Sequence, residues 1–387
     1  MTRKQVAILL VLVAVLGGAG LFLQKTKRGG WTSTSVPTTG KVLDFPINDV
    51  ARVLVRGPKG QVQLAKKNDV WTVEERGDYP ANFDQVSALI RRLWELKAVQ
   101  EVEVGPSQFV RLELVEPEKG DNPGTLVELK DRDDKSLARI IAGKTNVRKT
   151  EGLPGGMGNV PAGRYVLAMP SGKVSLVAES LTEINPRAES WLKRDFIKIE
   201  DPESIMLAGQ AAPRHWTLTH AKGSTDWKFA DAKPNEQIDQ QKVSSLPSLI
   251  SNLNFTDVLP PDSKPQESGL DKPDILTVQT FDRFRYSLKI GKPSDTNYPV
   301  SISVTADLVR ERTPSQDEKP EDKTRLDQEF QAHLKGLEQK AAAEKEYEKR
   351  IYLIVKSSLD PFLKDRGTFL AEKKPKPTAS PSPRGKR

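Results

Sequence analysis

The sequence predicts an α+β protein: two tandem copies of a mainly antiparallel sheet-plus-helix unit, preceded by one transmembrane helix. Three observations support this: an apolar run near the N-terminus, segments of alternating apolar and polar residues, and helical stripes of apolar residues at three- and four-residue steps. The alternating segments and the stripes recur in the same order in both halves of the chain, which indicates an internal repeat. We expect 42–200 to form the first copy and 201–372 the second.

The predicted transmembrane helix is the run 6–23, whose 18 residues carry no charge. As a helix it would be about 27 Å long, close to the hydrocarbon thickness of a bilayer. Basic residues flank it on both sides, so their charge does not orient it. A cleaved signal peptide is the alternative, because the small residues 18–20 are similar to a cleavage site. We expect an uncleaved signal anchor over 1–28 and a Ser/Thr/Gly-rich linker over 29–41.

Composition excludes several classes of function. The chain has no cysteine, so disulfides, cysteine-ligated zinc and thiol nucleophiles are ruled out. The formal net charge is +8, but residues 1–41 and 373–387 together hold twelve basic side chains and no acidic one. The body between them is therefore acidic overall, whereas a nucleic-acid-binding surface needs a basic face. We predict no nucleic-acid partner, and a basic disordered tail over 373–387.

The first copy is expected to begin with an antiparallel meander, because its first three alternating segments are separated by turn residues. A helix should follow Asn82, where apolar residues fall on one helical face. That face comprises Phe83, Val86, Leu89, Ile90, Leu93 and Leu96. The expected strands of this copy are 51–55, 61–64, 70–73, 126–129, 137–141, 164–167 and 173–177, and it closes on 191–197.

The second copy repeats this order. Its helical stripe spans 238–253 but contains Pro247, which removes an intrahelical hydrogen bond, so the helix should begin near Ser245 or kink there. The expected strands are 204–207, 216–218, 227–229, 275–278, 286–290, 297–300 and 350–355.

A charged insertion, 310–349, interrupts the second copy. Its first part carries prolines and predicts a loop, whereas 324–350 is rich in Glu, Lys, Gln and Ala and predicts a long helix. A narrow apolar stripe runs along this helix. It consists of Leu326, Phe330, Leu334, Leu337 and Ala341. The stripe predicts either a solvated arm that packs on its own domain or a partner-docking helix, and partial disorder is a third alternative.

No motif points to catalysis. Gly143-Lys144 is similar to the end of a phosphate loop, but Ala138 occupies the position where that motif needs glycine. His215 and His220 are five residues apart on an expected strand, so they point to opposite faces and do not form a shared metal site. No nucleophile–base arrangement is evident. We predict no enzyme, no catalytic residue, no cofactor, no metal and no bound nucleotide.

Three groups of segments form a pattern: 70–73 with 79–82, 112–117 with 124–129 and Gly143-Lys144, and 163–166 with 191–196. The pattern resembles a bacterial family known as domain of unknown function 4340. The resemblance implies an N-terminal membrane anchor, an extracytoplasmic body, and genes that often lie beside components of gliding-motility-type ABC transporters. It implies no catalytic residues. The insertion departs from the usual pattern of this family.

We therefore expect a non-catalytic accessory protein of an ABC-type export system. It would lie in the inner (cytoplasmic) membrane with a single pass, with its body in the periplasm facing the cell envelope, and its partners would be the membrane and ABC transporter subunits. One alternative is a binding module for envelope polysaccharide or peptidoglycan, which exposed aromatic rows on a sheet face would favour. An uncharacterised hydrolase is the other, which a cleft with two close carboxylates in unlike environments would favour.

Overall fold

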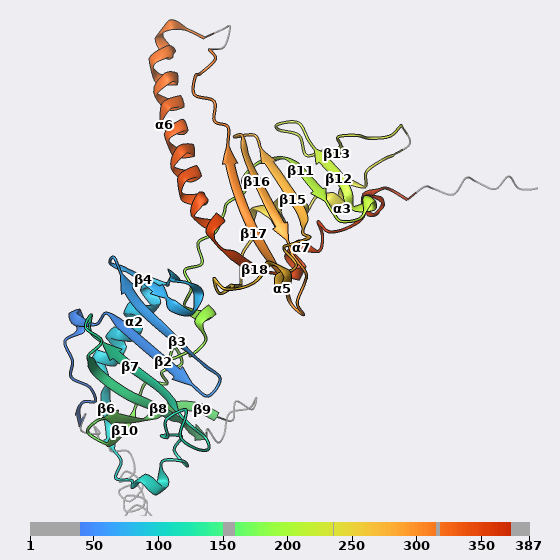
Figure 1. Ribbon diagram of the computed structural model, residues 1–387. Coiled ribbons are helices and arrows are strands. Elements are labelled where there is room, and N and C mark those ends of the chain that lie inside the picture. The colour runs from blue at the N-terminus through green and yellow to red at the C-terminus, as the bar shows by residue number, and fades with distance from the viewer. Residues whose placement is uncertain (1–38, 150–158, 235, 315–317, 373–387) are drawn as a thin grey trace, which may run out of the picture. The chain divides into compact units, whose positions relative to one another are not determined.

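The computed structural model describes residues 39–149, 159–234, 236–314 and 318–372. The chain divides into two compact units, one of Met1–Gln61 with Ser87–Pro186 and the other of Val62–Val86 with Arg187–Arg387. Most of the regular structure is antiparallel sheet (Figure 1). The predicted domain boundaries at 42–200 and 201–372 stay predictions.

The first sheet has ten strands in the order β1-β6-β10-β9-β8-β7-β2-β3-β4-β5. Apolar residues alternate inward along them; in β2, for example, Val53 and Val55 are buried and Arg52 is exposed. The strands are β1 (Thr39–Lys41), β2 (Arg52–Gly57), β3 (Gly60–Lys67), β4 (Val70–Val73), β5 (Tyr79–Pro80), β6 (Lys97–Glu101), β7 (Thr125–Lys130), β8 (Ser136–Lys149), β9 (Asn159–Met169) and β10 (Lys173–Val177).

The second sheet has eight strands in the order β13-β12-β11-β15-β16-β17-β18-β14. They are β11 (Pro202–Ala208), β12 (His215–Thr219), β13 (Lys228–Phe229), β14 (Asp257–Val258), β15 (Asp274–Thr280), β16 (Phe284–Ile290), β17 (Asn297–Ala306) and β18 (Ile351–Val355). If β1 and β5 are left out and the strands of each sheet are numbered along the chain, the two sheets have the same strand order. In both sheets the short strand after the helical region pairs with the last strand, β6 with β10 and β14 with β18; β14 lies at the edge of its sheet, whereas β1 pairs with the outer side of β6.

The helical regions differ between the two halves. Helix α2 (Phe83–Glu95) is continuous, buries Val86, Leu89 and Leu93, and is capped by the side chain of Asn82, which accepts a hydrogen bond from the backbone of Gln85 at 3.1 Å. The corresponding region of the second half is split into α3 (Gln240–Val243) and α4 (Leu246–Ser251), with the predicted break at the proline.

Helix α6 (Pro320–Glu344) is the longest described helix, and in Figure 1 it extends past the ends of β15, β16 and β17. A short 3-10 segment, η7 (Lys345–Lys349), connects it to β18. The remaining α-helices are the single turns α5 (Pro265–Ser268) and α7 (Lys356–Leu359). The insertion therefore contains a helix, as predicted, and its N-terminal boundary lies four residues earlier because Pro320 starts the first turn.

The structure corrects the predicted fold class and the predicted location. Both include a transmembrane helix, and the location is a single pass through the inner membrane with an extracytoplasmic body. Within the four described ranges, no helix has the length and apolar character of a bilayer span, and even α6, with 25 residues, is rich in charged side chains. The architecture is instead two extended antiparallel sheets with few helices. Three of the predicted segments lie wholly or mostly outside the described residues: the anchor 6–23, the part 29–38 of the linker 29–41, and the tail 373–387.

Candidate functional site

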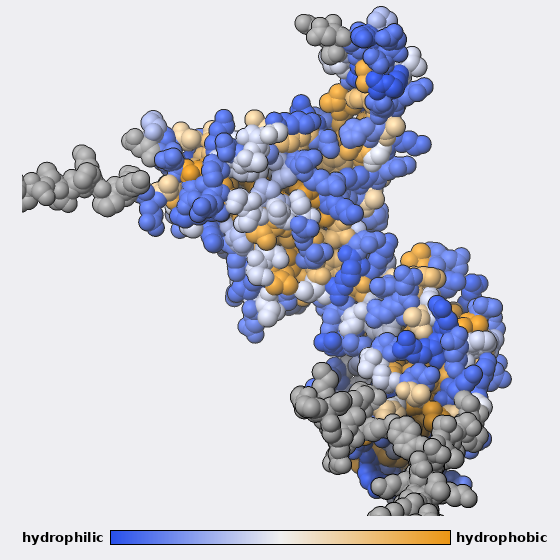
Figure 2. Space-filling model, turned by 180° about the vertical axis from the view of Figure 1, so that it is seen from behind, coloured by the Kyte–Doolittle hydropathy of each residue, from blue (hydrophilic) through white to orange (hydrophobic). Residues whose placement is uncertain are grey.

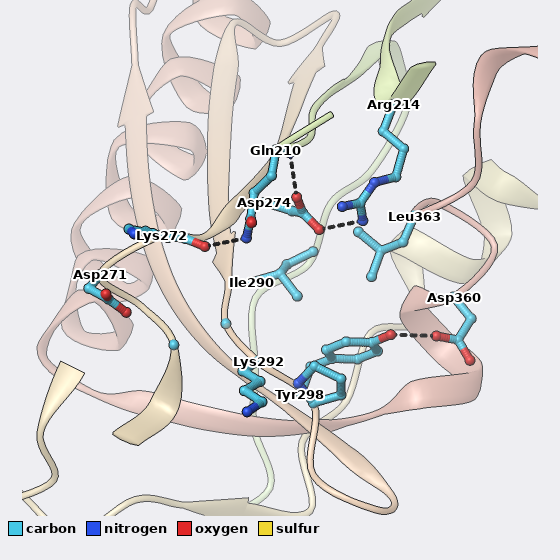
Figure 3. A pocket seen from close by; sticks show the side chains of 13 residues that line it. Gln210, Arg214, Asp271, Lys272, Asp274, Ile290, Lys292, Tyr298, Asp360 and Leu363 are labelled. Atoms are coloured by element: carbon cyan, nitrogen blue, oxygen red, sulfur yellow. Dashed lines mark hydrogen bonds and ion pairs between the residues drawn. The ribbon is translucent and has the colours of Figure 1, made fainter. Parts of the chain in front are cut away.

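A cavity of about 600 Å³ lies at one end of the second sheet, beside the start of β15 and the end of β16. Figure 3 shows side chains from these strands, from β17 and from neighbouring loops around it. We call it the lysine-rimmed cavity, after the exposed Lys272 and Lys292. Its other principal lining residues are Gln210, Arg214, Asp274, Tyr298 and Asp360.

Asp274, the first residue of β15, is buried at the wall of this cavity. Its Oδ1 accepts a hydrogen bond from the backbone N–H of Gln210 at 2.9 Å, and its Oδ2 accepts one from Arg214 Nη1 at 2.7 Å. A buried carboxylate is costly unless its oxygens are paired. Asp274 therefore holds the loop after β11 against β15, and its charge is already compensated.

Tyr298, near the start of β17, is paired in the same way. Its hydroxyl donates a hydrogen bond to Oδ1 of Asp360 at 2.8 Å. Burial, and then this hydrogen bond, raise the pKa of Tyr298 to about 12. The phenol is therefore neutral at physiological pH, and one carboxylate oxygen of Asp360 is engaged.

The position of Lys292 is fixed by the glycine before it. A Cβ atom on Gly291 would lie 2.1 Å from the carbonyl oxygen of Ser268, so only glycine allows this close approach. The approach lets the backbone N–H of Lys292 donate to the same oxygen at 2.8 Å. The first half of the chain repeats the arrangement, with Lys144 N–H donating to the carbonyl of Leu112 at 2.8 Å. The Gly-Lys pair is thus a packing device.

The two rim lysines and the exposed Asp271 differ from the other charged groups of the cavity, which are paired within the fold. In the part of the chain that the structure describes, neither Lys272 nor Lys292 forms an ion pair, whereas Arg214 is paired with Asp274. Lysine ammonium groups on flexible stems bind carboxylate or phosphate groups as point charges. The geometry suits the capture of an anionic group. Among the described residues no cluster of three or more potential metal ligands occurs.

The stripe predicted on the insertion lies elsewhere, on one face of α6. Leu326, Phe330, Leu334, Leu337 and Ala341 are each half-buried, and the lining of the lysine-rimmed cavity contains none of them. Figure 2 shows hydrophobic residues gathered on one side of the α6 region and hydrophilic residues over much of the rest. The docking role of the stripe stays a prediction.

Neighbouring side chains of α6 contact its own unit. Lys340 lies 5.2 Å from the ring centre of Phe284 and forms an ion pair with Glu200 at 2.8 Å, while His333 lies 3.8 Å from Asp282. These contacts anchor the C-terminal half of the helix beside β16.

Sequence reasoning missed the cavity, because its pairs are far apart in the chain. Arg214 and Asp274 are separated by 60 residues, and Tyr298 and Asp360 by 62. The recurrence of Gly-Lys after equivalent strands was the one local signal, and it marks the wall of the cavity.

Three of the segments that resemble a known family, 70–73, 79–82 and 191–196, are joined by backbone hydrogen bonds within one unit. Ala81 N–H donates to the carbonyl of Trp71, and Asn82 N–H to that of Trp191, both at 2.7 Å. Lys193 N–H donates to the carbonyl of Pro80 at 2.9 Å. This part of the pattern is therefore structural, because its segments bond to one another through their backbones.

No curated protein and no solved structure matches the chain significantly. The family model described as a domain of unknown function (DUF4340) matches residues 71–273, more than half of the chain. This match confirms the resemblance seen in the sequence. The chain belongs to the family of the domain of unknown function 4340.

Proposed function

We propose that this protein is a non-catalytic accessory protein of an ABC-type, gliding-motility-like transport system, and that its lysine-rimmed cavity binds an acidic segment of a partner subunit. The observation that carries the proposal is the division of charges in the cavity. Asp274 and Asp360 are each bound by a donor within the fold, whereas the two lysines on the rim have no ion-pair partner among the described residues and outnumber the one other carboxylate without an ion pair, Asp271. The family resemblance supports the choice of transport system.

Binding suits this cavity better than catalysis does. A general base must be available to take a proton, and a carboxylate held by arginine and a backbone donor is a poor one. Exposed lysines instead provide electrostatic attraction that is specific in sign and weakened by salt. Among the large hydrophobic side chains exposed in the described residues, only Phe83 is aromatic, so no aromatic row favours a polysaccharide-binding role.

Affinity purification under gentle detergent, followed by mass spectrometry, tests the proposal. The native chain is expected to recover ABC transporter subunits, and the double variant Lys272→Glu/Lys292→Glu should recover about tenfold less, as the loss of about 1.4 kcal/mol implies. The matched control is Lys228→Glu/Lys335→Glu, which reverses two exposed lysines outside the cavity. Equal recovery by both double variants would refute the role of the cavity, and no transporter subunit with the native chain would refute the accessory function.

A further inference from the structure

A second cavity, of about 680 Å³, lies near the start of β11 and is lined by aromatic and proline residues. We call it the aromatic cavity. Its apolar lining comprises Pro202, His220, Trp227, Pro247 and Phe281. The ring of His220 lies 4.3 Å from that of Trp227 at 36° and 5.3 Å from that of Phe281 at 79°. Three rings therefore meet at one wall.

The wall is held in place by hydrogen bonds to the backbone. His220 Nε2 lies 2.7 Å from the carbonyl oxygen of Pro202, and its Nδ1 lies 2.8 Å from that of Ser224. Both ring nitrogens are thus engaged, so only the face of the His220 ring is available to a ligand. The backbone of Trp227 is fixed by the side chain of Gln240, which accepts from its N–H at 3.1 Å and donates to its carbonyl at 2.8 Å.

The last described residues of the chain run beside the same helical segment. Ala371 N–H donates to the carbonyl of Gln237 at 2.9 Å, and Lys242 Nζ donates to that of Leu370 at 3.1 Å. Lys242 is two residues from Ser244 and five from Pro247, which both line the aromatic cavity. Ser244 directly follows α3 and Pro247 lies in the first turn of α4, and five residues of polyproline helix span about 16 Å. The residues that follow Glu372 are therefore within reach of the cavity.

The sequence of 373–387 has the chemistry that such a cavity recognises. It contains prolines at 375, 377, 381 and 383, six basic residues and no acidic residue. Proline-rich segments favour the polyproline II conformation and bind grooves lined by aromatic rings at low entropic cost. Two aspartates, Asp201 and Asp282, also line the cavity, against one cation, Lys222, whose Nζ lies 6.0 Å from the ring centre of Phe281, so the charged lining is acidic overall and complements basic side chains.

We propose that the proline-rich segment 373–387 of this chain docks intramolecularly in the aromatic cavity. The prolines lie against the half-buried rings of His220 and Phe281, which the buried Trp227 supports through its contact with His220, and the basic side chains lie toward Asp201 and Asp282. The cavity is thereby a peptide site whose resident occupant is the chain's own C-terminal segment. A partner that competes for the site has to displace this segment first.

Because the chain contains no cysteine, pairs of introduced cysteines test the docking in the full chain. Ser244→Cys with Ser380→Cys places one thiol at the aromatic cavity and one in the segment, and Ser294→Cys with Ser380→Cys is the matched control at a different cavity. A short bismaleimide should cross-link the first pair at least about fivefold more than the second, because docking raises the effective concentration. Replacing all four prolines of the segment with serine should abolish the difference.

Three results would overturn the proposal. Equal cross-linking of the two pairs would show that the segment does not prefer the aromatic cavity. Full cross-linking after the proline replacement would show that proline recognition is not involved. A cross-linked product of twice the mass of the chain would identify the occupant as the segment of a second copy.

Discussion

The hydroxyl of Tyr286 donates a hydrogen bond to Oε2 of Glu344 across 2.7 Å, which joins β16 to the last residue of α6. Oε1 of Glu344 accepts a second bond from the backbone N–H of Lys198 at 2.9 Å. Glu344 is only 5% exposed, and burial raises its pKa, while the two hydrogen bonds lower it less than burial raises it. The long helix is therefore fastened to its unit by a buried carboxyl group whose pKa is raised above its usual value.

This relationship predicts a pH dependence of stability. The folded pKa of Glu344 lies above its usual value of 4.5, so the folded state holds this proton more tightly than the unfolded state does. Its contribution to the free energy of unfolding is fully present below about pH 4.5 and is lost as the pH rises through the folded pKa. Urea unfolding at a series of pH values should show that Glu344→Gln removes this slope. The exposed Glu338→Gln on the same helix should leave it intact, and an unchanged slope in Glu344→Gln would contradict the prediction.

Removing the donor should destabilise the same joint. Tyr286→Phe leaves one oxygen of a buried carboxylate unpaired, at a cost of about 1–3 kcal/mol in the free energy of unfolding. In a double-mutant cycle with Glu344→Gln, the two effects should fail to add, because the residues share one hydrogen bond. Additive effects would show that the bond contributes nothing.

The glycine at the lysine-rimmed cavity predicts a second stability effect. Gly291→Ala would place a methyl group 2.1 Å from a carbonyl oxygen, and overpacking of this kind costs about 1–3 kcal/mol. The control is Gly336→Ala within α6, where nothing lies within 4 Å and alanine should stabilise the helix by about 0.5–1 kcal/mol. Thermal unfolding measures both changes. If Gly291→Ala is as stable as the native chain, the packing argument is wrong.

The titration of Tyr298 provides a fourth prediction. Burial is the largest cause of its pKa of about 12, and the bond to Asp360 adds to it. Asp360→Asn should therefore lower the pKa only in part. The phenolate absorbance, measured against Tyr298→Phe, reports the value directly. Since the folded pKa is raised, the contribution of Tyr298 to stability should be lost between about pH 10 and pH 12. A full return to the ordinary value in Asp360→Asn would make the carboxylate the main cause.

The ion pair at the start of β15 provides a fifth prediction. Arg214→Met leaves the carboxylate of Asp274 without its cation, and the loss of a charge-assisted hydrogen bond costs about 1.5–3 kcal/mol. Lys242→Met disrupts a more exposed pair with Asp239 and should cost no more than about 1 kcal/mol. Equal losses in denaturant unfolding would show that burial of Asp274 does not strengthen its pair.

Much of the local structure follows from the sequence. Apolar spacing predicts α2, the proline at 247 predicts the break between α3 and α4, and the composition of the insertion predicts α6. Periodicity reports only which face of an element is buried, however, and it cannot report which distant element covers that face. The grouping of Val62–Val86 with Arg187–Arg387 is accordingly not visible in the sequence. The same reason hides the cavity, whose paired side chains come from separate elements.

The shared strand order of the two sheets has a consequence for how each half is used. Arg164 in β9 and Tyr298 in β17 occupy equivalent positions. Arg164 lies two residues before Val166, which pairs with Ala142, and Tyr298 lies two residues before Val300, which pairs with Ile290. The guanidinium of Arg164 donates to the carbonyls of Gly143 and Leu181 at 2.7 and 3.1 Å, so it braces the framework from within. The two sheets thus use equivalent positions differently. In the first sheet the side chain at this position braces the backbone internally, whereas in the second sheet it lines an open cavity whose occupant can be selected by the residues around it.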